Sequence, residues 1–179
     1  MKIPAIPALL AALLAGASLT SSAANADIPQ RQRQSPDALR VISANVRYPA
    51  KVDMKTGDDW DSRKALARDV LLAQDADLIC FQEFTKEHLE YLEGQLPGYT
   101  SFGFVDSEGG RKVNTVFYST KRFEKISEGG AFLSATPDVF YSKFAESSLV
   151  RQVTRLHFKD RATGRELIDR KSTRLNSSH

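Results

Sequence analysis

The strongest constraint on the fold is a short, continuously apolar run at residues 78–81, Leu-Ile-Cys-Phe, which ends abruptly at Gln82 and Glu83. A strand that lacks alternating polar residues needs both of its faces covered, so this run indicates a strand inside a layered α/β protein. The polar residues that follow then lie where the strand ends. The sequence therefore predicts that Glu83 closes the carboxyl end of a buried strand.

The elements around this run are predicted in the order strand, loop, helix, strand, helix. A strand at residues 40–46 is followed by a polar loop at 49–59. The next helix is capped by Asp61 or Ser62. Its apolar residues gather on one side at helical spacing: Leu66, Val70, Leu71 and Ala73. A second helix, at residues 85–95, is stopped by Pro97 and Gly98.

The remaining sequence reads as strands joined by turns. Strands are predicted at residues 99–105, 113–119, 122–127 and 149–158, with turns at 108–110 and 160–164. A β-α-β-α beginning followed by a run of strands is typical of a layered α/β fold with mixed sheets. We expect one domain over residues 39–168.

The first 38 residues are predicted to lie outside that domain. Lys2, an apolar stretch at residues 6–14 and the small residues at 24–26 form the pattern of an export signal over residues 1–26. The apolar stretch is too short for a membrane anchor. Residues 27–38 are polar, carry two prolines and are expected to form a flexible leader. An export signal implies a periplasmic or extracellular protein.

The last residues, 169–179, match the translation of a common sequencing-library adapter, and we expect them to be foreign to the fold. The 179-residue chain has a net charge of +3, of which Lys2 supplies +1 and this tail +2, so the rest is neutral. The high pI is therefore no signature of nucleic-acid binding. Cys80, the only cysteine, is expected to be a buried thiol, and the histidines fall in no catalytic or zinc-binding pattern.

Several segments, in their order and spacing, resemble the endonuclease/exonuclease/phosphatase superfamily, which has the DNase I-like fold. The first two are Val-Ile-Ser-Ala-Asn-Val-Arg-Tyr at 41–48 and Asp-Leu-Ile-Cys-Phe-Gln-Glu at 77–83. The others lie at residues 96–99, 114–118, 129–137 and 151–154. The resemblance implies an α/β sandwich of two mixed β-sheets flanked by helices, and the small exported bacterial members fit best.

The resemblance also implies a metal-dependent phosphoesterase site. Glu83 and Asn45 would hold Mg²⁺ or Mn²⁺ and act in catalysis, because a hard cation prefers oxygen ligands. Arg151 and Asn114 would bind the substrate phosphate, Arg151 through its bidentate guanidinium. The residues alone also allow plainer roles: a solvated acid at Glu83, turn amides at Asn45 and Asn114, and a surface charge at Arg151.

Three later segments of the superfamily pattern, Asn-Thr-His, Gly-Asp-x-Asn and Ser-Asp-His, do not occur in the sequence. We therefore expect the chain to be the N-terminal half of the fold and, as it stands, an inactive fragment of a monomeric enzyme. Its substrate stays open among nucleic acids, phospholipid head groups and sugar phosphates. The alternative is a non-catalytic exported module of the same fold that binds phosphorylated or sugar ligands.

Overall fold

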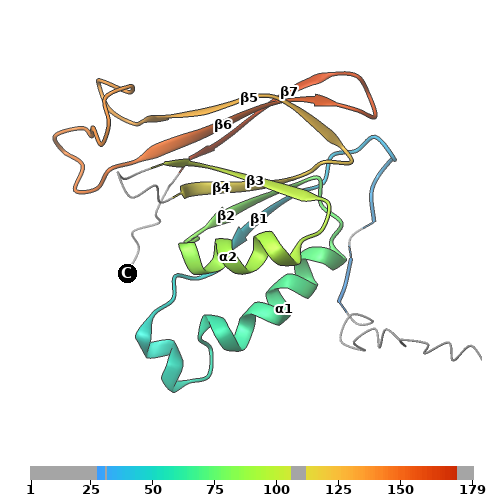
Figure 1. Cartoon of the computed structure of the whole chain (residues 1–179), viewed down its shortest axis with the longest axis horizontal. Helices are drawn as coiled ribbons and strands as arrows, with labels where there is room; N and C mark the ends of the chain where they lie inside the picture. Colours follow the sequence, from blue (N-terminus) through green and yellow to red (C-terminus); the bar gives the residue numbers. More distant parts are fainter. Residues whose placement is uncertain (1–27, 31, 106–111, 173–179) are drawn as a thin grey trace, which may run out of the picture.

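The computed structural model describes residues 28–30, 32–105 and 112–172, which form three stacked layers (Figure 1). Two helices cover one face of a four-stranded sheet, and a three-stranded sheet covers its other face. The elements are β1 (Val41–Asn45), η2 (Lys51–Lys55), α1 (Trp60–Ala73), β2 (Leu78–Gln82), α2 (Lys86–Gln95), β3 (Tyr99–Val105), β4 (Lys112–Ser119), β5 (Phe123–Phe132), β6 (Gln152–Asp160) and β7 (Glu166–Ser172).

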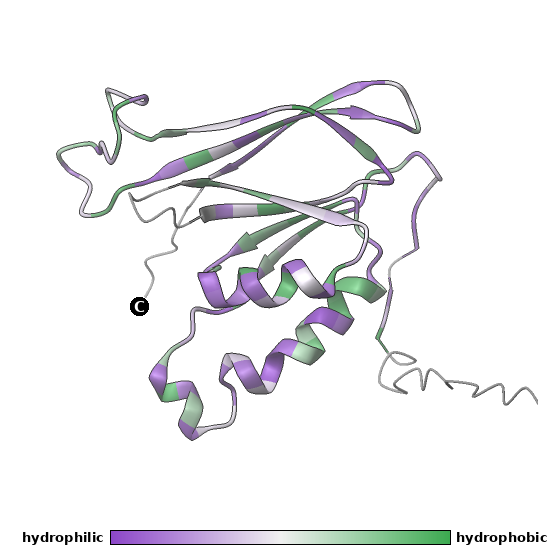
Figure 2. Ribbon diagram, in the orientation of Figure 1, coloured by the Kyte–Doolittle hydropathy of each residue, from purple (hydrophilic) through white to green (hydrophobic). Residues whose placement is uncertain are grey.

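The first sheet has the strand order β1-β2-β4-β3 and is mixed, since β1 and β2 are parallel whereas the other neighbours are antiparallel. Its central strand β2 is covered on both faces, as the apolar run predicts. Ile79 and Phe81 pack toward the helices with Leu92, whereas Leu78 packs with Phe158 of the other sheet. The apolar residues of β2 and its neighbours lie between the layers (Figure 2).

The second sheet, β5-β6-β7, is antiparallel throughout its described strands. It lies close against the first sheet at Gly130, where an added Cβ would collide with the Phe104 ring of β3 and lie 2.7 Å from the Val153 carbonyl oxygen. A glycine is needed here because the two sheets leave no room for a side chain. The turn predicted at residues 160–164 joins β6 to β7, with Gly164 at φ 71°.

The helices follow the predicted order, but the cap and the buried face of α1 were predicted wrongly. The helix begins at Trp60, two or three residues earlier than expected, and its N-cap is Asp59, whose side chain accepts a hydrogen bond from the Ser62 backbone N–H. Leu66 is 61% exposed and Val70 is 38% exposed. The buried stripe instead runs through Trp60, Ala67 and Leu71, because Trp60 anchors the start of the helix against α2. By contrast, α2 matches its prediction and is capped by Thr85.

The predicted polar loop at residues 49–59 contains the short 3-10 helix η2. The expected flexible leader also makes specific contacts with the domain. The Arg33 guanidinium binds the buried Asp77 carboxylate, with an Nη1–Oδ2 distance of 2.6 Å, and Arg122 donates to the Asp37 carbonyl oxygen at 2.8 Å. A buried carboxylate needs such a partner, which gives residues 32–38 a defined place on the domain.

Strand β7 extends over residues 169–172, the first part of the tail that the sequence marks as foreign. Asp169 and Lys171 occupy its inward positions near Cys80, and burial raises the pKa of Asp169 and lowers that of Lys171. The charged side chains of Asp169 and Lys171 fit poorly on a strand face whose preceding inward residue, Leu167, packs on the core.

The export signal, the turn at 108–110 and residues 173–179 lie outside the described residues. No helix in the described part is long and apolar enough to cross a membrane.

We predict that Gly130→Ala destabilises the chain by about 1–3 kcal/mol, because the added methyl group overpacks the seam between the two sheets. The matched control is Gly129→Ala, where the nearest atom to an added Cβ is the Arg155 guanidinium at 3.8 Å. This neighbouring substitution is expected to be neutral or stabilising, since glycine is unfavourable within a strand. Urea denaturation of both variants tests the prediction, and equal midpoints would contradict it.

Candidate active site

The parallel pairing of β1 and β2 brings the carboxyl ends of both strands to the same edge of the sheet. Asn45, the last residue of β1, lies opposite Gln82, the last residue of β2. Glu83 follows directly, as predicted. Both strands point toward the end of the molecule where the β5–β6 connection also lies (Figure 1).

The Glu83 carboxylate is held by two hydrogen bonds, one to each oxygen. The Asn45 side-chain amide donates to Oε1 at 2.9 Å, and the Tyr48 backbone N–H donates to Oε2 at 2.8 Å. The Asn45 side-chain oxygen in turn accepts from the Arg47 backbone N–H at 2.8 Å. Asn45 therefore bridges the turn after β1 and the acid after β2, and fixes the direction in which Glu83 points.

Two residues of this arrangement have left-handed backbone conformations that non-glycine residues seldom adopt. The φ angle is 59° at Arg47 and 54° at Glu83. Such conformations cost about 1–3 kcal/mol each and persist only where the surroundings enforce them. The carboxylate is thus presented by a strained turn on each of the two strands.

The turn after β1 is tied to η2 by a bidentate ion pair. The Arg47 guanidinium donates to both oxygens of Asp53, at 2.7 and 2.6 Å. Asp53 is buried, and hydrogen bonding to Arg47 holds the pKa of its carboxyl group below the usual range. The remainder of the Arg47 side chain is exposed next to Glu83. This ion pair fixes the position of the turn, and its Arg47 guanidinium interacts electrostatically with Glu83.

Asn114 and Arg151 reach the same end of the molecule from the other strands. Asn114 lies near the start of β4, at an irregularity in the pairing of that strand with β3. Asn114 is buried, has φ 50°, and donates from its side chain to the Gln152 carbonyl oxygen at 3.0 Å. It thereby links the two sheets, and Arg151 immediately precedes the linked residue. The structure thus brings Asn45 and Glu83 together at the ends of β1 and β2, and it brings Asn114 to the segment that follows Arg151.

The oxygen-bearing side chains at this edge, those of Glu83 and Asn45, are of the kind that a magnesium-type ion binds. Such ions take one or two carboxylates and complete their octahedron with water and substrate phosphate. Glu83 offers one carboxylate, which Asn45 and the Tyr48 backbone hold in place and which interacts electrostatically with the Arg47 guanidinium. The described residues contain no cluster of three or more His, Cys, Asp or Glu side chains able to hold a metal by themselves. Glu83 therefore fits as a single protein ligand with Asn45 as its orienting partner.

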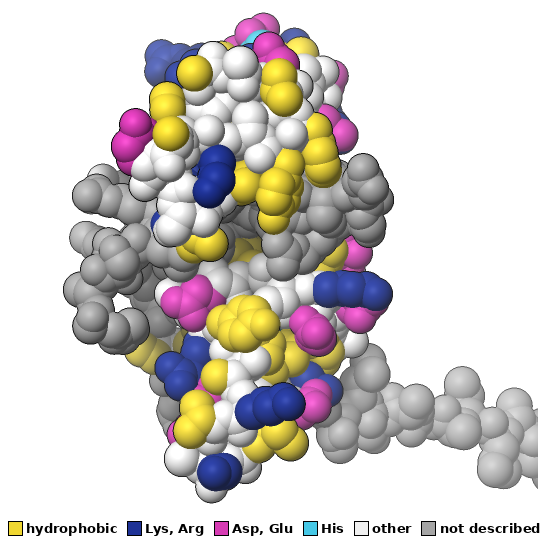
Figure 3. Space-filling model, turned by 90° about the vertical axis from the view of Figure 1, so that its left-hand side faces the viewer, with side chains coloured by type: hydrophobic (Ala, Val, Ile, Leu, Met, Phe, Trp, Pro, Cys, Tyr) yellow, Lys and Arg dark blue, Asp and Glu magenta, His cyan; other side chains and the backbone are white. Residues whose placement is uncertain are grey.

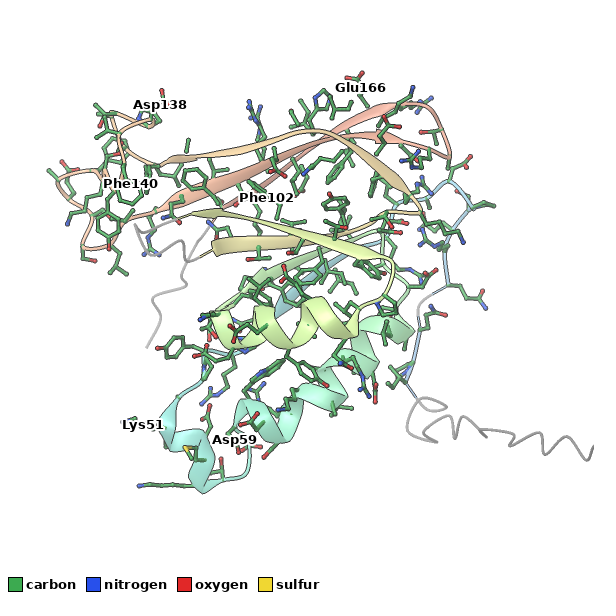
Figure 4. All side chains as sticks on the ribbon, in the orientation of Figure 1. Lys51, Asp59, Phe102, Asp138, Phe140 and Glu166 are labelled. Carbon is green, nitrogen blue, oxygen red and sulfur yellow. The ribbon has the colours of Figure 1, made fainter. Side chains whose placement is uncertain are left out.

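A cavity of about 250 Å³ opens beside this turn. Its walls combine apolar and charged residues: Pro49, Ala50, Lys51, Met54, Asp59, Trp60, Asp61 and Glu87. Lys51 and Asp59 lie at the same end of the molecule as Asp138 and Phe140 of the β5–β6 connection (Figure 4). This hollow lies on the helix side of the turn, and the residues that line it do not include Asn45, Glu83, Asn114 or Arg151.

The β5–β6 connection, residues 133–151, forms the opposite border of the same end. It exposes a group of large apolar side chains: Val139, Phe140, Tyr141, Phe144 and Leu149. Apolar side chains gather on this part of the surface in the end-on view (Figure 3). The connection leads directly into Arg151.

His88 is a buried residue near the site for which the sequence indicated no role. It is fully buried at the start of α2, and its Nδ1 accepts a hydrogen bond from the Thr85 backbone N–H at 3.1 Å, so Nε2 carries the proton of the neutral ring. Burial, and then the charge of Arg63, lower the pKa of His88 to about 4. The three-residue spacing from Thr85 is the one available signal, since it is the spacing of a helix capping box.

No family model matches the chain, and no curated protein matches it. Several solved structures do match the chain. An endonuclease/exonuclease/phosphatase family protein from Bacteroides thetaiotaomicron is 32% identical over 74% of this chain and 47% of its own, with a TM-score of 0.67. The chain belongs to the endonuclease/exonuclease/phosphatase superfamily.

A mannosyl-6-phosphatase of Bacteroides thetaiotaomicron VPI-5482 is a second superfamily structure at 32% identity and TM-score 0.67, covering 74% of this chain and 50% of that one. A Bacteroides vulgatus structure at 23% identity and TM-score 0.67 covers 75% of this chain and 51% of its own, and supports the fold alone. The chain thus spans about half the length of these superfamily structures. The layered α/β sandwich predicted from the sequence is confirmed, although only the first of its two sheets is mixed.

We predict that the free energy of unfolding decreases as the pH falls from 6.5 to about 4, the interval between the ordinary and folded-state pKa values of His88. The unfolded chain binds the proton first in this interval, so acid favours unfolding, by up to about 3 kcal/mol. Urea denaturation at several pH values measures the slope.

The His88→Gln variant should show a shallower slope than the unmodified chain across this interval. The control is Leu92→Ala, because Leu92 is equally buried on α2 but carries no titratable group, so it should lower stability without changing the slope. An unaltered slope in His88→Gln would show that another group dominates the acid dependence.

Proposed function

We propose that this chain is the N-terminal part of an exported phosphoesterase that depends on Mg²⁺ or Mn²⁺. The observation that carries the proposal is the Glu83 carboxylate at the end of β2, held on both oxygens by Asn45 and the Tyr48 backbone, in a superfamily fold. Export rests on the signal pattern of residues 1–26, and implies a periplasmic or extracellular location.

In the proposed mechanism each protein group has a separate task. Glu83 would hold the cation, whose chemistry is to stabilise negative charge on the phosphoryl oxygens. Asn45 orients Glu83, and the side chain of Arg47 adds positive charge nearby. Arg151 would clamp two phosphate oxygens through its guanidinium, whereas Asn114 would fix the backbone of that segment and contact the phosphate. These groups position and stabilise, and leave activation of the attacking water to residues beyond those described.

The proposed substrate class is phosphate esters. The superfamily structure at 32% identity that carries a substrate name is a mannosyl-6-phosphatase, so a mannose 6-phosphate ester is the first substrate to test on the complete gene product. Neutral charge outside the two ends gives little general attraction to nucleic-acid phosphates, which nonspecific nucleases exploit. Assays should therefore compare a sugar phosphate with DNA and a phospholipid, each with and without a chelator.

We predict that Glu83→Gln weakens Mn²⁺ binding to the 179-residue chain roughly 100-fold or more, because the amide keeps the size of the side chain but removes the ligand charge. Calorimetry or Mn²⁺ electron paramagnetic resonance measures the affinity. The control is Glu90→Gln, which removes an exposed acid whose partner is Lys86. Equal Mn²⁺ affinity in Glu83→Gln and the unmodified chain would refute the metal assignment.

We predict that Arg151→Lys, in the complete gene product, raises KM for a phosphate monoester about tenfold, since lysine cannot make the bidentate contact. Arg155→Lys is the matched control, because Arg155 is an exposed arginine on β6, the strand that begins directly after Arg151. Unchanged KM in Arg151→Lys would remove Arg151 from the substrate site. A complete product that binds phosphate esters without turning them over would instead support the non-catalytic module.

A further inference from the structure

The loop that connects β1 to α1 is closed at both of its ends by one side chain of the helix layer. Arg63 of α1 donates from Nη1 to the Val46 carbonyl oxygen at 3.1 Å and from Nε to the Asp58 carbonyl oxygen at 2.5 Å. Val46 directly follows β1, and Asp58 lies two residues before α1 begins. The two ends of the loop are therefore held together, with η2 between them.

Asp53 lies in the middle of this loop and is fixed there by its backbone. Its N–H donates to the Ala50 carbonyl oxygen at 3.0 Å, and its own carbonyl oxygen accepts from the N–H groups of Thr56 and Asp58 at 3.2 and 3.1 Å. The residue is only 4% exposed, and a buried carboxylate needs a partner. That partner is the Arg47 guanidinium, which donates to both carboxylate oxygens.

The backbone of Arg47 in turn directs both hydrogen bonds to Glu83. The Arg47 N–H binds the Asn45 side-chain oxygen, and the amide of the same Asn45 side chain donates to Glu83. On the other side of the Arg47 Cα, the Tyr48 N–H donates to Glu83. Because Arg47 has φ 59°, this conformation persists only where the surroundings enforce it. The two-point contact with Asp53 supplies that constraint.

We propose that Asp53 is a positioning residue, which acts through Arg47 to aim the Glu83 carboxylate at its cation. The inference deepens the proposed function and rests on it for the identity of that cation. The described hydrogen bonds of Asp53 are with Arg47 and with its own loop, so its role is indirect. Groups that orient a metal ligand from behind typically change metal affinity by about 10–100-fold when they are removed.

The test compares two substitutions that differ in charge but break the same contact. Asp53→Asn keeps the size of the side chain and removes its charge, whereas Arg47→Lys keeps the charge and cannot make the two-point contact. We expect the Mn²⁺ affinity of the 179-residue chain, measured by calorimetry, to fall about tenfold in both variants. A purely electrostatic effect of the pair would instead leave Arg47→Lys unchanged.

The matched control is Asp69→Asn. Asp69 is a similarly buried carboxylate, 7% exposed, and it pairs with Arg68 within α1. Its substitution should lower the melting temperature, as Asp53→Asn should, because each leaves a buried arginine contact unmade. It should not change the Mn²⁺ affinity, since none of its described hydrogen bonds joins the turn after β1.

A second measurement tests the positioning role without any metal. Hydrogen exchange of the Tyr48 backbone amide, followed by NMR relative to the amides of β2, should be roughly tenfold faster in Asp53→Asn and Arg47→Lys than in the unmodified chain. The comparison with β2 removes the effect of a general loss of stability. Exchange should be unchanged in Asp69→Asn. If Asp53→Asn fails to fold, Arg47→Lys carries the comparison alone.

The outcomes separate this proposal from the proposed function. No Mn²⁺ binding by the unmodified chain would refute the metal site, while faster Tyr48 exchange would still support the positioning role. Unchanged Tyr48 exchange in both Asp53→Asn and Arg47→Lys would overturn the positioning role. Mn²⁺ affinity that falls in Asp53→Asn but not in Arg47→Lys would also overturn it, because the effect would then follow the charge and not the contact.

Discussion

The parallel pairing of β1 with β2 is the constraint on which the candidate site depends. Antiparallel pairing would send the two carboxyl ends to opposite edges, and Asn45 could not reach Glu83. Parallel pairing brings them within one hydrogen bond of each other. It also requires a crossover, and that connection supplies η2 and α1, whose side chains then support the turn after β1. The parallel pairing therefore determines both where Glu83 lies and much of the structure that supports it.

The packing between the two sheets positions the second part of the candidate site, the segment next to Arg151. At Gly130 the sheets approach so closely that no side chain fits between the backbone and Phe104. Toward the site end, the Asn114 side chain spans the same seam to the backbone of Gln152. These contacts fix the strand that begins after Arg151 relative to the strand that precedes Glu83.

Local patterns predicted the elements and the position of Glu83, because a continuous apolar run and its polar end are properties of neighbouring residues. The buried side of α1 was predicted wrongly, since it depends on Trp60 packing against α2, a contact between distant segments. The contacts of Arg33, which docks the leader on Asp77, also join distant segments and were not predicted. The same is true of the contacts of His88 with the rings of Trp60 and Phe84. The sequence resemblance proposed four site residues, whereas the hydrogen bonds that orient Asn45 and Glu83 depend on the fold and could not be predicted from it.

The left-handed backbone at Glu83 has a consequence for how such sites diverge. A β-branched residue fits this conformation badly, whereas glycine, asparagine and aspartate tolerate it. A lineage that abandoned the chemistry but kept the architecture would therefore drift toward Gly or Asn at this position and away from Val, Ile or Thr. The backbone conformation at Glu83 thus limits which substitutions can remove the function and still leave the protein folded.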